Sequence, residues 1–221
     1  IIREEGCVPA VVAVADGKLH VGISDELLER LATEKNVLKV SRRDLPIALA
    51  SGALGATTVS GTLIAAHRAG VRVFVTGGIG GVHRDADKTL DISADLEELA
   101  ISNVAVISTG IKSILDLPKT LEVLETNGVP VVGFQTDELP AFYTRKSGLK
   151  LVATAETPHE VASIMKAKWD CDIEGSILLA NPIPEEFEAD ADIINDSIHA
   201  ALAMADKKGI IGKEITPFIL A

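Results

Sequence analysis

Short apolar runs alternate with amphipathic stretches along most of the chain, which predicts strands alternating with helices. Strand-like runs rich in aliphatic residues occur at 37–40, 71–76, 104–108, 129–134, 151–155 and 176–180. Helical stretches lie between them at 61–69, 94–100, 118–126, 158–169 and 191–207. Strands and helices at this spacing need crossover connections, so the pattern predicts an α/β fold, an α-β-α layered domain around a largely parallel sheet.

The beginning of the chain departs from this alternation. Two β-rich runs, 8–15 and 19–23, flank Asp16-Gly17, the dipeptide that two-residue hairpin turns prefer. Ser24 then stands where a helix cap is expected. The hairpin adds an antiparallel element, so we expect a mostly parallel mixed sheet within a single domain over residues 1–221.

Both ends of the sequence differ from ordinary termini. Residues 1–6 lack a Met and resemble the last turn of a helix closed by a glycine. The stretch 216–221 stops on an apolar run, where a terminus is usually solvated. We therefore expect the domain to be incomplete at both ends.

The amino-acid composition and charge indicate what the core consists of and argue against nucleic-acid and membrane partners. The chain has 221 residues, 47% apolar but only 3% aromatic, so its core must consist mainly of Val, Ile, Leu and Ala. A net charge of -11 without a basic run argues against nucleic acid. No apolar run approaches the roughly 20 residues that span a bilayer, and no signal segment opens the chain, so no membrane partner is expected. Two cysteines without metal-type spacing fit a reducing compartment, and we expect a cytoplasmic protein.

Candidate ligand-binding residues follow the predicted strands, because ligands of α/β sheets gather beyond the carboxyl ends of strands. Lys39, Arg42 and Arg43 form a cationic group that suits a phosphate, although on composition alone a solvated turn before a helix is the simpler explanation. The stretch 55–61 consists of small and hydroxyl residues ahead of a helix, which favours anion binding. Its alternative is an ordinary helix cap at Ser60.

A glycine-rich loop at 76–84 follows the next strand. It is not a dinucleotide fingerprint, because the third glycine of a GxGxxG motif begun at Gly78 is replaced by His83. The glycines would still let the backbone approach a ligand closely. His83 could then bind the ligand or move a proton, or be structural.

Two further groups complete the candidate chemistry. Ser93 and Asp95 suit a plain helix start, whereas Asp91 lies outside that role and could hold a hard divalent ion together with water. Lys112 comes a few residues after a buried strand, which delivers its amine toward the same crevice. Burial and nearby cations favour the neutral amine that acts as a nucleophile.

Taken together, these motifs resemble those of the pseudouridine-5'-phosphate glycosidases, also called the indigoidine synthase A-like family. The matching segments are 39–46, 55–60, 76–84, 91–96, 112–116 and Asn181-Pro182-Ile183-Pro184. They occur in the same order and at the same spacing, and the resemblance covers essentially the whole chain.

The resemblance implies a function in pseudouridine catabolism, a part of nucleotide metabolism. Members reversibly split pseudouridine 5'-phosphate into uracil and ribose 5-phosphate with a divalent metal, usually manganese, and are classed as glycosidases (hydrolases) or lyases. Lys112 would be the nucleophile that forms a Schiff base, and Asp91 the metal ligand. The implied substrate contacts are Lys39, Thr58, Val59, Thr76, His83, Ser93, Ala94 and Asp95. A carbon leaving group needs an electron sink, which an imine at the anomeric carbon supplies.

The resemblance has limits. The family's proton-donating glutamate has no counterpart here, because Glu4 and Glu5 stand in the wrong place, so the activity is predicted for the whole protein. The family further implies a homotrimer, with the irregular stretch 135–150 as a candidate interface, and some members are fused to a sugar kinase. The alternatives are a Schiff-base aldolase, a noncatalytic sugar-phosphate-binding module and, weakened by the failed fingerprint, a nicotinamide oxidoreductase.

Overall fold

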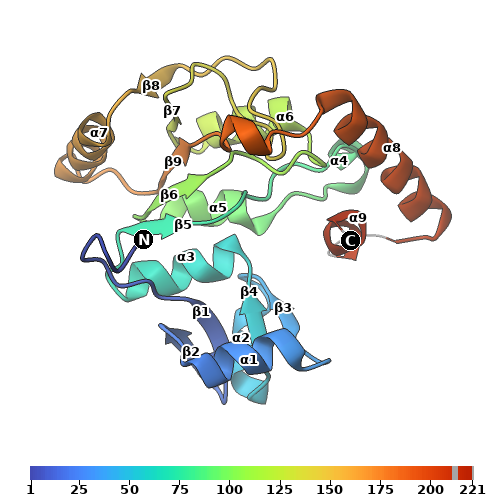
Figure 1. The fold of residues 1–221 in the computed structure, drawn as a ribbon. Helices are drawn as coiled ribbons and strands as arrows, with labels where there is room; N and C mark the ends of the chain where they lie inside the picture. Colours follow the sequence, from blue (N-terminus) through green and yellow to red (C-terminus); the bar gives the residue numbers. More distant parts are fainter. Residues whose placement is uncertain (211–213, 221) are drawn as a thin grey trace.

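The computed structural model describes residues 1–210 and 214–220, and its strands form two sheets (Figure 1). One sheet has four strands in the order β2-β1-β4-β3, and the other has five in the order β5-β6-β9-β7-β8. The α/β class and the largely parallel pairing are confirmed. The opening hairpin, however, joins the smaller sheet instead of extending the larger one.

The smaller sheet begins with the predicted hairpin. Its strands are β1 (Val12–Ala15), β2 (Lys18–Val21), β3 (Leu38–Val40) and β4 (Gly55–Thr57). Asp16 and Gly17 turn the hairpin with φ values of 50° and 73°, the positive values that this turn requires. β1 pairs antiparallel with β2 and β4, whereas β3 and β4 are parallel. Two helices, α1 (Asp25–Thr33) and α2 (Leu45–Ser51), connect these strands.

The larger sheet is entirely parallel and lies between layers of helices. Its strands are β5 (Val73–Val75), β6 (Ala105–Ser108), β7 (Val131–Phe134), β8 (Ala153–Ala155) and β9 (Ile177–Ala180). The covering helices are α5 (Ala94–Ile101), α6 (Leu117–Thr126), α7 (Pro158–Asp170) and α8 (Ala191–Lys207). Side chains of α5, α6 and α8 pack into one aliphatic core, and those of α7 into a second core with β7 and β9, so the α-β-α layering is confirmed.

Helix α3 (Val59–Arg68) lies between the two sheets (Figure 1). Leu63 belongs to the main core, whereas Ile64 packs against the core of the smaller sheet. Gly61 allows close packing, because a Cβ there would lie 2.9 Å from the carbonyl oxygen of Val40. The helix therefore packs against both sheets, and this packing places its N-terminus next to each of them.

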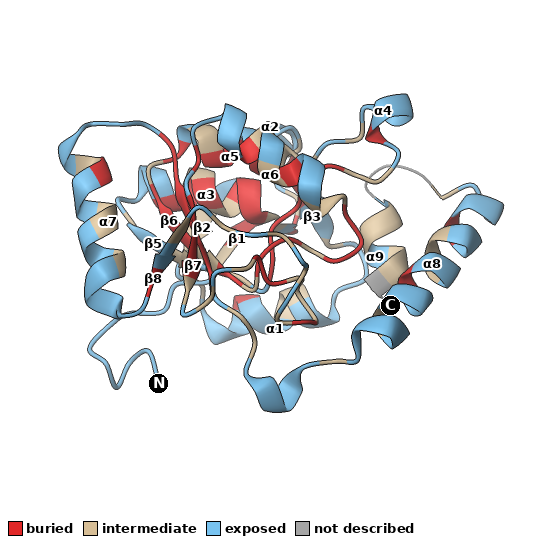
Figure 2. Ribbon diagram, turned by 90° about the horizontal axis from the view of Figure 1, so that it is seen from above, coloured by how far each residue is buried: buried red, intermediate tan, exposed pale blue. Residues whose placement is uncertain are grey.

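Besides β4, three short elements were not predicted: α4 (Ala86–Thr89), the 3-10 helix Glu185–Phe187 and α9 (Ile215–Leu220). α9 packs against α8, with Lys208 Nζ 5.0 Å from the ring centroid of Phe218. Burial is concentrated in β1, β6, β7 and β9 and on the inward faces of the helices (Figure 2). As predicted, the core consists mainly of Val, Ile, Leu and Ala.

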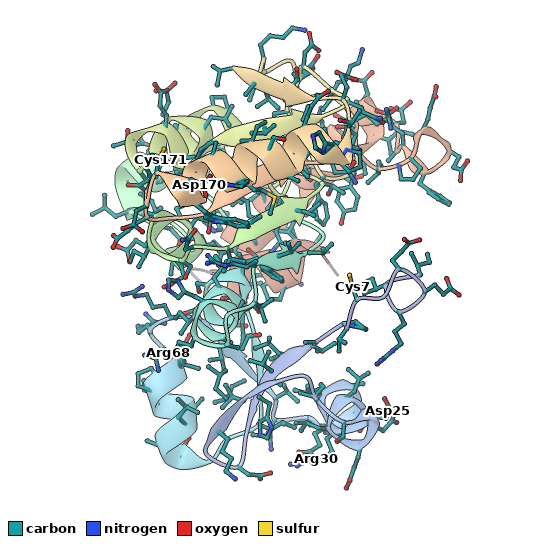
Figure 3. All side chains as sticks on the ribbon, turned by 90° about the vertical axis from the view of Figure 1, so that its left-hand side faces the viewer. Cys7, Asp25, Arg30, Arg68, Asp170 and Cys171 are labelled. Atoms are coloured by element: carbon teal, nitrogen blue, oxygen red, sulfur yellow. The ribbon has the colours of Figure 1, made fainter. Side chains whose placement is uncertain are left out.

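The two cysteines are exposed free thiols, and Cys7 and Cys171 lie in separate parts of the molecule (Figure 3). Residues 1–6 form a turn in which the Glu5 amide donates to the carbonyl oxygen of Ile1 at 3.1 Å, and Gly6 follows with a φ of 75°. Within the described ranges, no helix combines the length and the apolar character that crossing a membrane requires.

Candidate active site

A cavity of about 710 Å³ is lined by residues that follow strands of both sheets. Of the site residues implied by the family resemblance, all except Thr76 line it: Lys39, Thr58, Val59, His83, Asp91, Ser93, Ala94, Asp95 and Lys112. The cavity thus brings together segments that are far apart in the sequence, from Val37 to Thr216. This is the location beyond the carboxyl ends of strands at which α/β proteins bind ligands.

Thr76 is the predicted site residue that the cavity lining does not include. It directly follows β5, and its amide donates to the carbonyl oxygen of Ile107 in β6 at 2.9 Å. This bond continues the pairing of β5 with β6. In this structure Thr76 therefore holds the strands together at the base of the glycine-rich loop.

Backbone hydrogen bonds join the glycine-rich loop to the loop that carries Lys112. The Thr109 amide donates to the carbonyl oxygen of Gly77 at 2.9 Å, and the Ile79 amide donates to that of Gly110 at 3.1 Å. The Lys112 amide then donates to the carbonyl oxygen of Ile79 at 3.2 Å. These bonds extend the alignment of β5 and β6 beyond the sheet, which places the half-buried Lys112 beside the loop.

The glycines of this loop make room for protein side chains. A Cβ at Gly78 would lie 2.5 Å from the ring of Phe142. One at Gly81 would lie 2.5 Å from Thr120 Oγ1. At Gly80, which also lines the cavity, a Cβ would lie 2.3 Å from Ser93 Oγ.

Replacing Gly80 with alanine is expected to displace Ser93 and Asp95, because the new methyl group would occupy their positions. We expect a loss of about 1 to 3 kcal/mol of unfolding free energy. Catalytic turnover should fall by about 10-fold or more, because misplaced site groups are costly. Denaturant unfolding and an activity assay measure the two effects. Gly77→Ala is the matched control, since its Cβ would meet Phe142 at an ordinary 3.6 Å; equal behaviour of the two variants would contradict the prediction.

Asp95 connects the two halves of the site. Its side chain is only 4% exposed. Oδ1 accepts the Ser60 amide at 2.8 Å and Oδ2 accepts the Gly80 amide at 2.8 Å. One carboxylate thus binds the first turn of α3 to the glycine-rich loop, so backbone amides already engage both carboxylate oxygens of this predicted substrate contact.

His83 and Asp91 lie side by side in the cavity wall, with Nδ1 3.9 Å from Oδ2. The His83 amide also donates to the carbonyl oxygen of Asp91 at 3.1 Å. Burial and the charges of Lys39 and Lys112 lower the pKa of His83 below its ordinary 6.5, while Asp91 opposes this shift. His83 is therefore mostly neutral at neutral pH and retains a nitrogen that can accept a proton or a hydrogen bond.

The three predicted cationic residues do not all face the cavity. Lys39 and Arg43 line the cavity, whereas Arg42 forms an ion pair with the buried carboxylate of Glu98. The alternative interpretation of Ser60 as a helix cap is wrong, because α3 begins at Val59 with Thr58 as N-cap. Thr58 Oγ1 instead lies 2.9 Å from Ser60 Oγ, since the earlier start places Ser60 within the first turn.

Some lining residues were not identified from the sequence as candidate ligand contacts, among them Ser41, Leu115 and Thr216. Ser41 was hidden by its local role, since its hydroxyl donates to Asp44 Oδ2 at 2.8 Å. Thr216 comes from α9, about a hundred residues after Lys112, and nothing in the local sequence marks it. Its place in the cavity wall depends on how α9 packs.

Comparison with known proteins finds a matching family model and relatives that share the name pseudouridine-5'-phosphate glycosidase. Residues 1–221 match the family described as "Indigoidine synthase A like protein". A pseudouridine-5'-phosphate glycosidase of Petrotoga mobilis is 59% identical over 220 residues, covering 100% of this chain and 72% of the relative. One of Staphylococcus aureus is 55% identical over the same shares.

Two solved structures have the same fold at substantial identity. The prealnumycin C-glycosynthase AlnA, in complex with ribulose 5-phosphate, superposes with a TM-score of 0.91 at 45% identity, covering 99% of this chain and 72% of that one. An indigoidine synthase A-like protein of Thermotoga maritima gives a TM-score of 0.89 at 40% identity, covering 99% of this chain and 71% of that one.

Proposed function

Because the chain belongs to the indigoidine synthase A-like family, we propose that it is a pseudouridine-5'-phosphate glycosidase. The reaction is the reversible cleavage of pseudouridine 5'-phosphate into uracil and ribose 5-phosphate. The observation that carries this proposal is the 59% identity, over the whole chain, to a relative of that name. The cavity supports this proposal, since Lys112 and Asp91 line it together with the basic residues Lys39 and Arg43.

Lys112 is proposed as the nucleophile. Its Nζ bonds to the anomeric carbon while the ring oxygen leaves that carbon and takes a proton. The nitrogen lone pair then forms the imine and expels uracil, whose C5 takes up a proton. Water hydrolyses the imine, which releases ribose 5-phosphate and regenerates the amine. The covalent intermediate divides a difficult carbon–carbon cleavage into easier steps.

The phosphate is proposed to bind at the end of the cavity formed by β3 and α3. Lys39 and Arg43 supply positive charge there, and Thr58 and Val59 present the N-terminal turn of a ten-residue helix. Helix N-termini and cations favour anions in combination. The net charge of -11 does not oppose this, because a few aimed donors decide the binding of a small anion.

Asp91 is the proposed ligand of a divalent cation, manganese by family resemblance. Its carboxylate is 30% exposed and lines the cavity, so a hard oxygen donor is available. No group of three or more His, Cys, Asp or Glu side chains suited to a metal occurs in the described residues. A mostly hydrated ion on one carboxylate fits this donor set. When bound, such an ion would polarise or organise nearby oxygens and waters.

The protein is also proposed to form a homotrimer and to reside in a reducing compartment. The family resemblance predicts a homotrimer, for which the stretch 135–150 is the candidate interface. Within the chain, Phe142 of this stretch donates its amide to the carbonyl oxygen of Thr109 at 3.1 Å. The exposed thiols Cys7 and Cys171 suit a reducing compartment such as the cytoplasm.

The proposed function is tested by incubating the protein with pseudouridine 5'-phosphate and manganese, then separating the products. We expect uracil and ribose 5-phosphate in equal amounts, and pseudouridine 5'-phosphate from the two products in the reverse direction. A chelator should reduce the rate, and added manganese should restore it. Cleavage within the sugar chain would instead indicate an aldolase, and binding without turnover would indicate a noncatalytic module.

A further inference from the structure

The proposed nucleophile stands at the start of a tight turn, residues 112–115. The turn is closed by the Leu115 amide, which donates to the carbonyl oxygen of Lys112 at 3.0 Å. Both ends are attached to the glycine-rich loop. The Lys112 amide donates to the carbonyl oxygen of Ile79, and the Asp116 amide donates to that of Val82 at 2.9 Å.

The middle of this turn is held by one side chain of the same loop. Arg84 Nη2 donates to the carbonyl oxygen of Ser113 at 3.1 Å. The hydroxyl of Ser113 is buried and has no hydrogen-bond partner among the described residues, so it does not anchor the turn. The guanidinium of Arg84 thus fixes the Ser113–Ile114 peptide group, which begins one residue after Lys112.

The surroundings of Arg84 favour this contact. Arg84 is half-buried and, together with Asp116, lines a second cavity of about 630 Å³ next to the turn. Burial acts to raise the pKa of Asp116, but hydrogen bonds from Lys119 and the charges of Lys119 and Arg84 lower it overall. The positive charge of Arg84 thus acts on the Asp116 carboxylate while its guanidinium donates to the Ser113 carbonyl, and a planar guanidinium donates its hydrogen bonds in fixed directions.

We propose that Arg84 is a positioning residue for the reaction, which acts by holding the Ser113 peptide so that Lys112 Nζ points at the anomeric carbon. This inference rests on the proposed role of Lys112. Arg84 itself touches no substrate in this account, because it does not line the active-site cavity. A small misplacement of a nucleophile is costly, by about 100-fold for a shift of 1 Å.

The test compares Arg84→Met and Arg84→Lys with the wild-type protein. Imine formation with ribose 5-phosphate is followed by cyanoborohydride trapping and mass spectrometry over a range of sugar concentrations. For Arg84→Met we expect the maximal trapping rate to fall by about 10- to 100-fold. The half-saturating concentration should change by no more than about threefold, because the proposed phosphate-binding groups are intact. Arg84→Lys should retain more of the rate than Arg84→Met.

Arg145→Met is the matched control, because Arg145 makes the same kind of contact with the carbonyl oxygen of Ile183, away from Lys112. Its trapping rate should equal that of the wild type. Millimolar guanidinium should raise the rate of Arg84→Met severalfold and leave the other proteins unchanged. An Arg84→Met rate within threefold of the wild type would overturn the proposal, as would a loss shared with Arg145→Met and not rescued by guanidinium.

Hydrogen exchange separates this proposal from the proposed function. Amides of residues 109–117 should exchange faster in Arg84→Met than in the wild type or in Arg145→Met. Faster exchange together with no adduct on the wild-type protein would reject the imine and leave the anchoring role supported. Unchanged exchange in this segment would reject the anchoring role, whatever the chemistry of Lys112.

Discussion

Replacing Lys112 with alanine is expected to abolish cleavage of pseudouridine 5'-phosphate, with a loss on the order of 10⁴-fold or more. Without the amine of Lys112, the imine that is proposed as the electron sink for cleavage of the carbon–carbon bond does not form. Lys112→Arg should be equally inactive, because a guanidinium keeps the charge but is not a nucleophile. Steady-state release of uracil measures both variants.

Folding should survive these changes. The contact of Lys112 with Ile79 is made by its backbone amide, and its side chain is only half-buried. Lys119→Ala is the matched control, because Lys119 is an exposed lysine outside the cavity that pairs with Asp116 at 3.0 Å. It should keep wild-type turnover. A folded Lys112→Ala protein that retains a tenth of the wild-type rate would show that Lys112 is not the nucleophile.

Replacing Asp95 with alanine is expected to have the largest effect on stability among the site residues. The change leaves the amides of Ser60 and Gly80 buried without their acceptor. Each buried unsatisfied donor costs about 1 to 3 kcal/mol, so the unfolding free energy should fall by about 2 to 5 kcal/mol. Denaturant unfolding gives this value.

The Asp95→Asn variant separates the geometry of the contact from the size of the side chain. An amide keeps one acceptor oxygen but turns a donor toward the second buried amide, so we expect a loss close to that of alanine. Asp137→Ala is the control, because Asp137 forms an exposed pair with Lys150 at 2.7 Å and should leave stability almost unchanged. Wild-type stability in Asp95→Asn would mean that the carboxylate does not bridge the two segments.

Much of the fold could be predicted because local signals and tertiary packing agree. Asp16-Gly17 supplies the turn of the hairpin, and Ser24 accepts the Leu27 amide as a helix cap at 3.2 Å. β4 was missed because it consists of Gly55, Ala56 and Thr57, which lack the bulk typical of strands. Gly55 is required there, since a Cβ would lie 2.4 Å from Val40 Cγ2.

The division into two sheets could not be predicted from the alternation of strands and helices. The order of elements does not say which strands pair, and the pairing of β1 with β4 depends on contacts distant in sequence. Helix α3 decides the outcome, because Leu63 and Ile64 face different cores. The sequence pattern shows that Leu63 and Ile64 are apolar, but it does not show that they pack against different sheets.

The site residues that directly follow strands could be predicted from the sequence. Contacts between segments that are distant in the sequence could not. Lys112 and His83 each follow a predicted strand, and the cavity contains both. Nothing in the local sequence indicates that Asp95 bridges Ser60 and Gly80, because this role needs segments about 15 and 35 residues away. The contribution of Thr216 depends likewise on the packing of α9.

The central claim, that Lys112 forms the imine, is tested most directly by reducing a mixture of the protein, ribose 5-phosphate and manganese with borohydride and locating the adduct by peptide mass spectrometry. The account predicts one pentose-phosphate adduct on the peptide containing Lys112, absent from Lys112→Ala. An adduct on another lysine of the cavity, such as Lys39, or a folded, sugar-binding protein without any adduct, would contradict it.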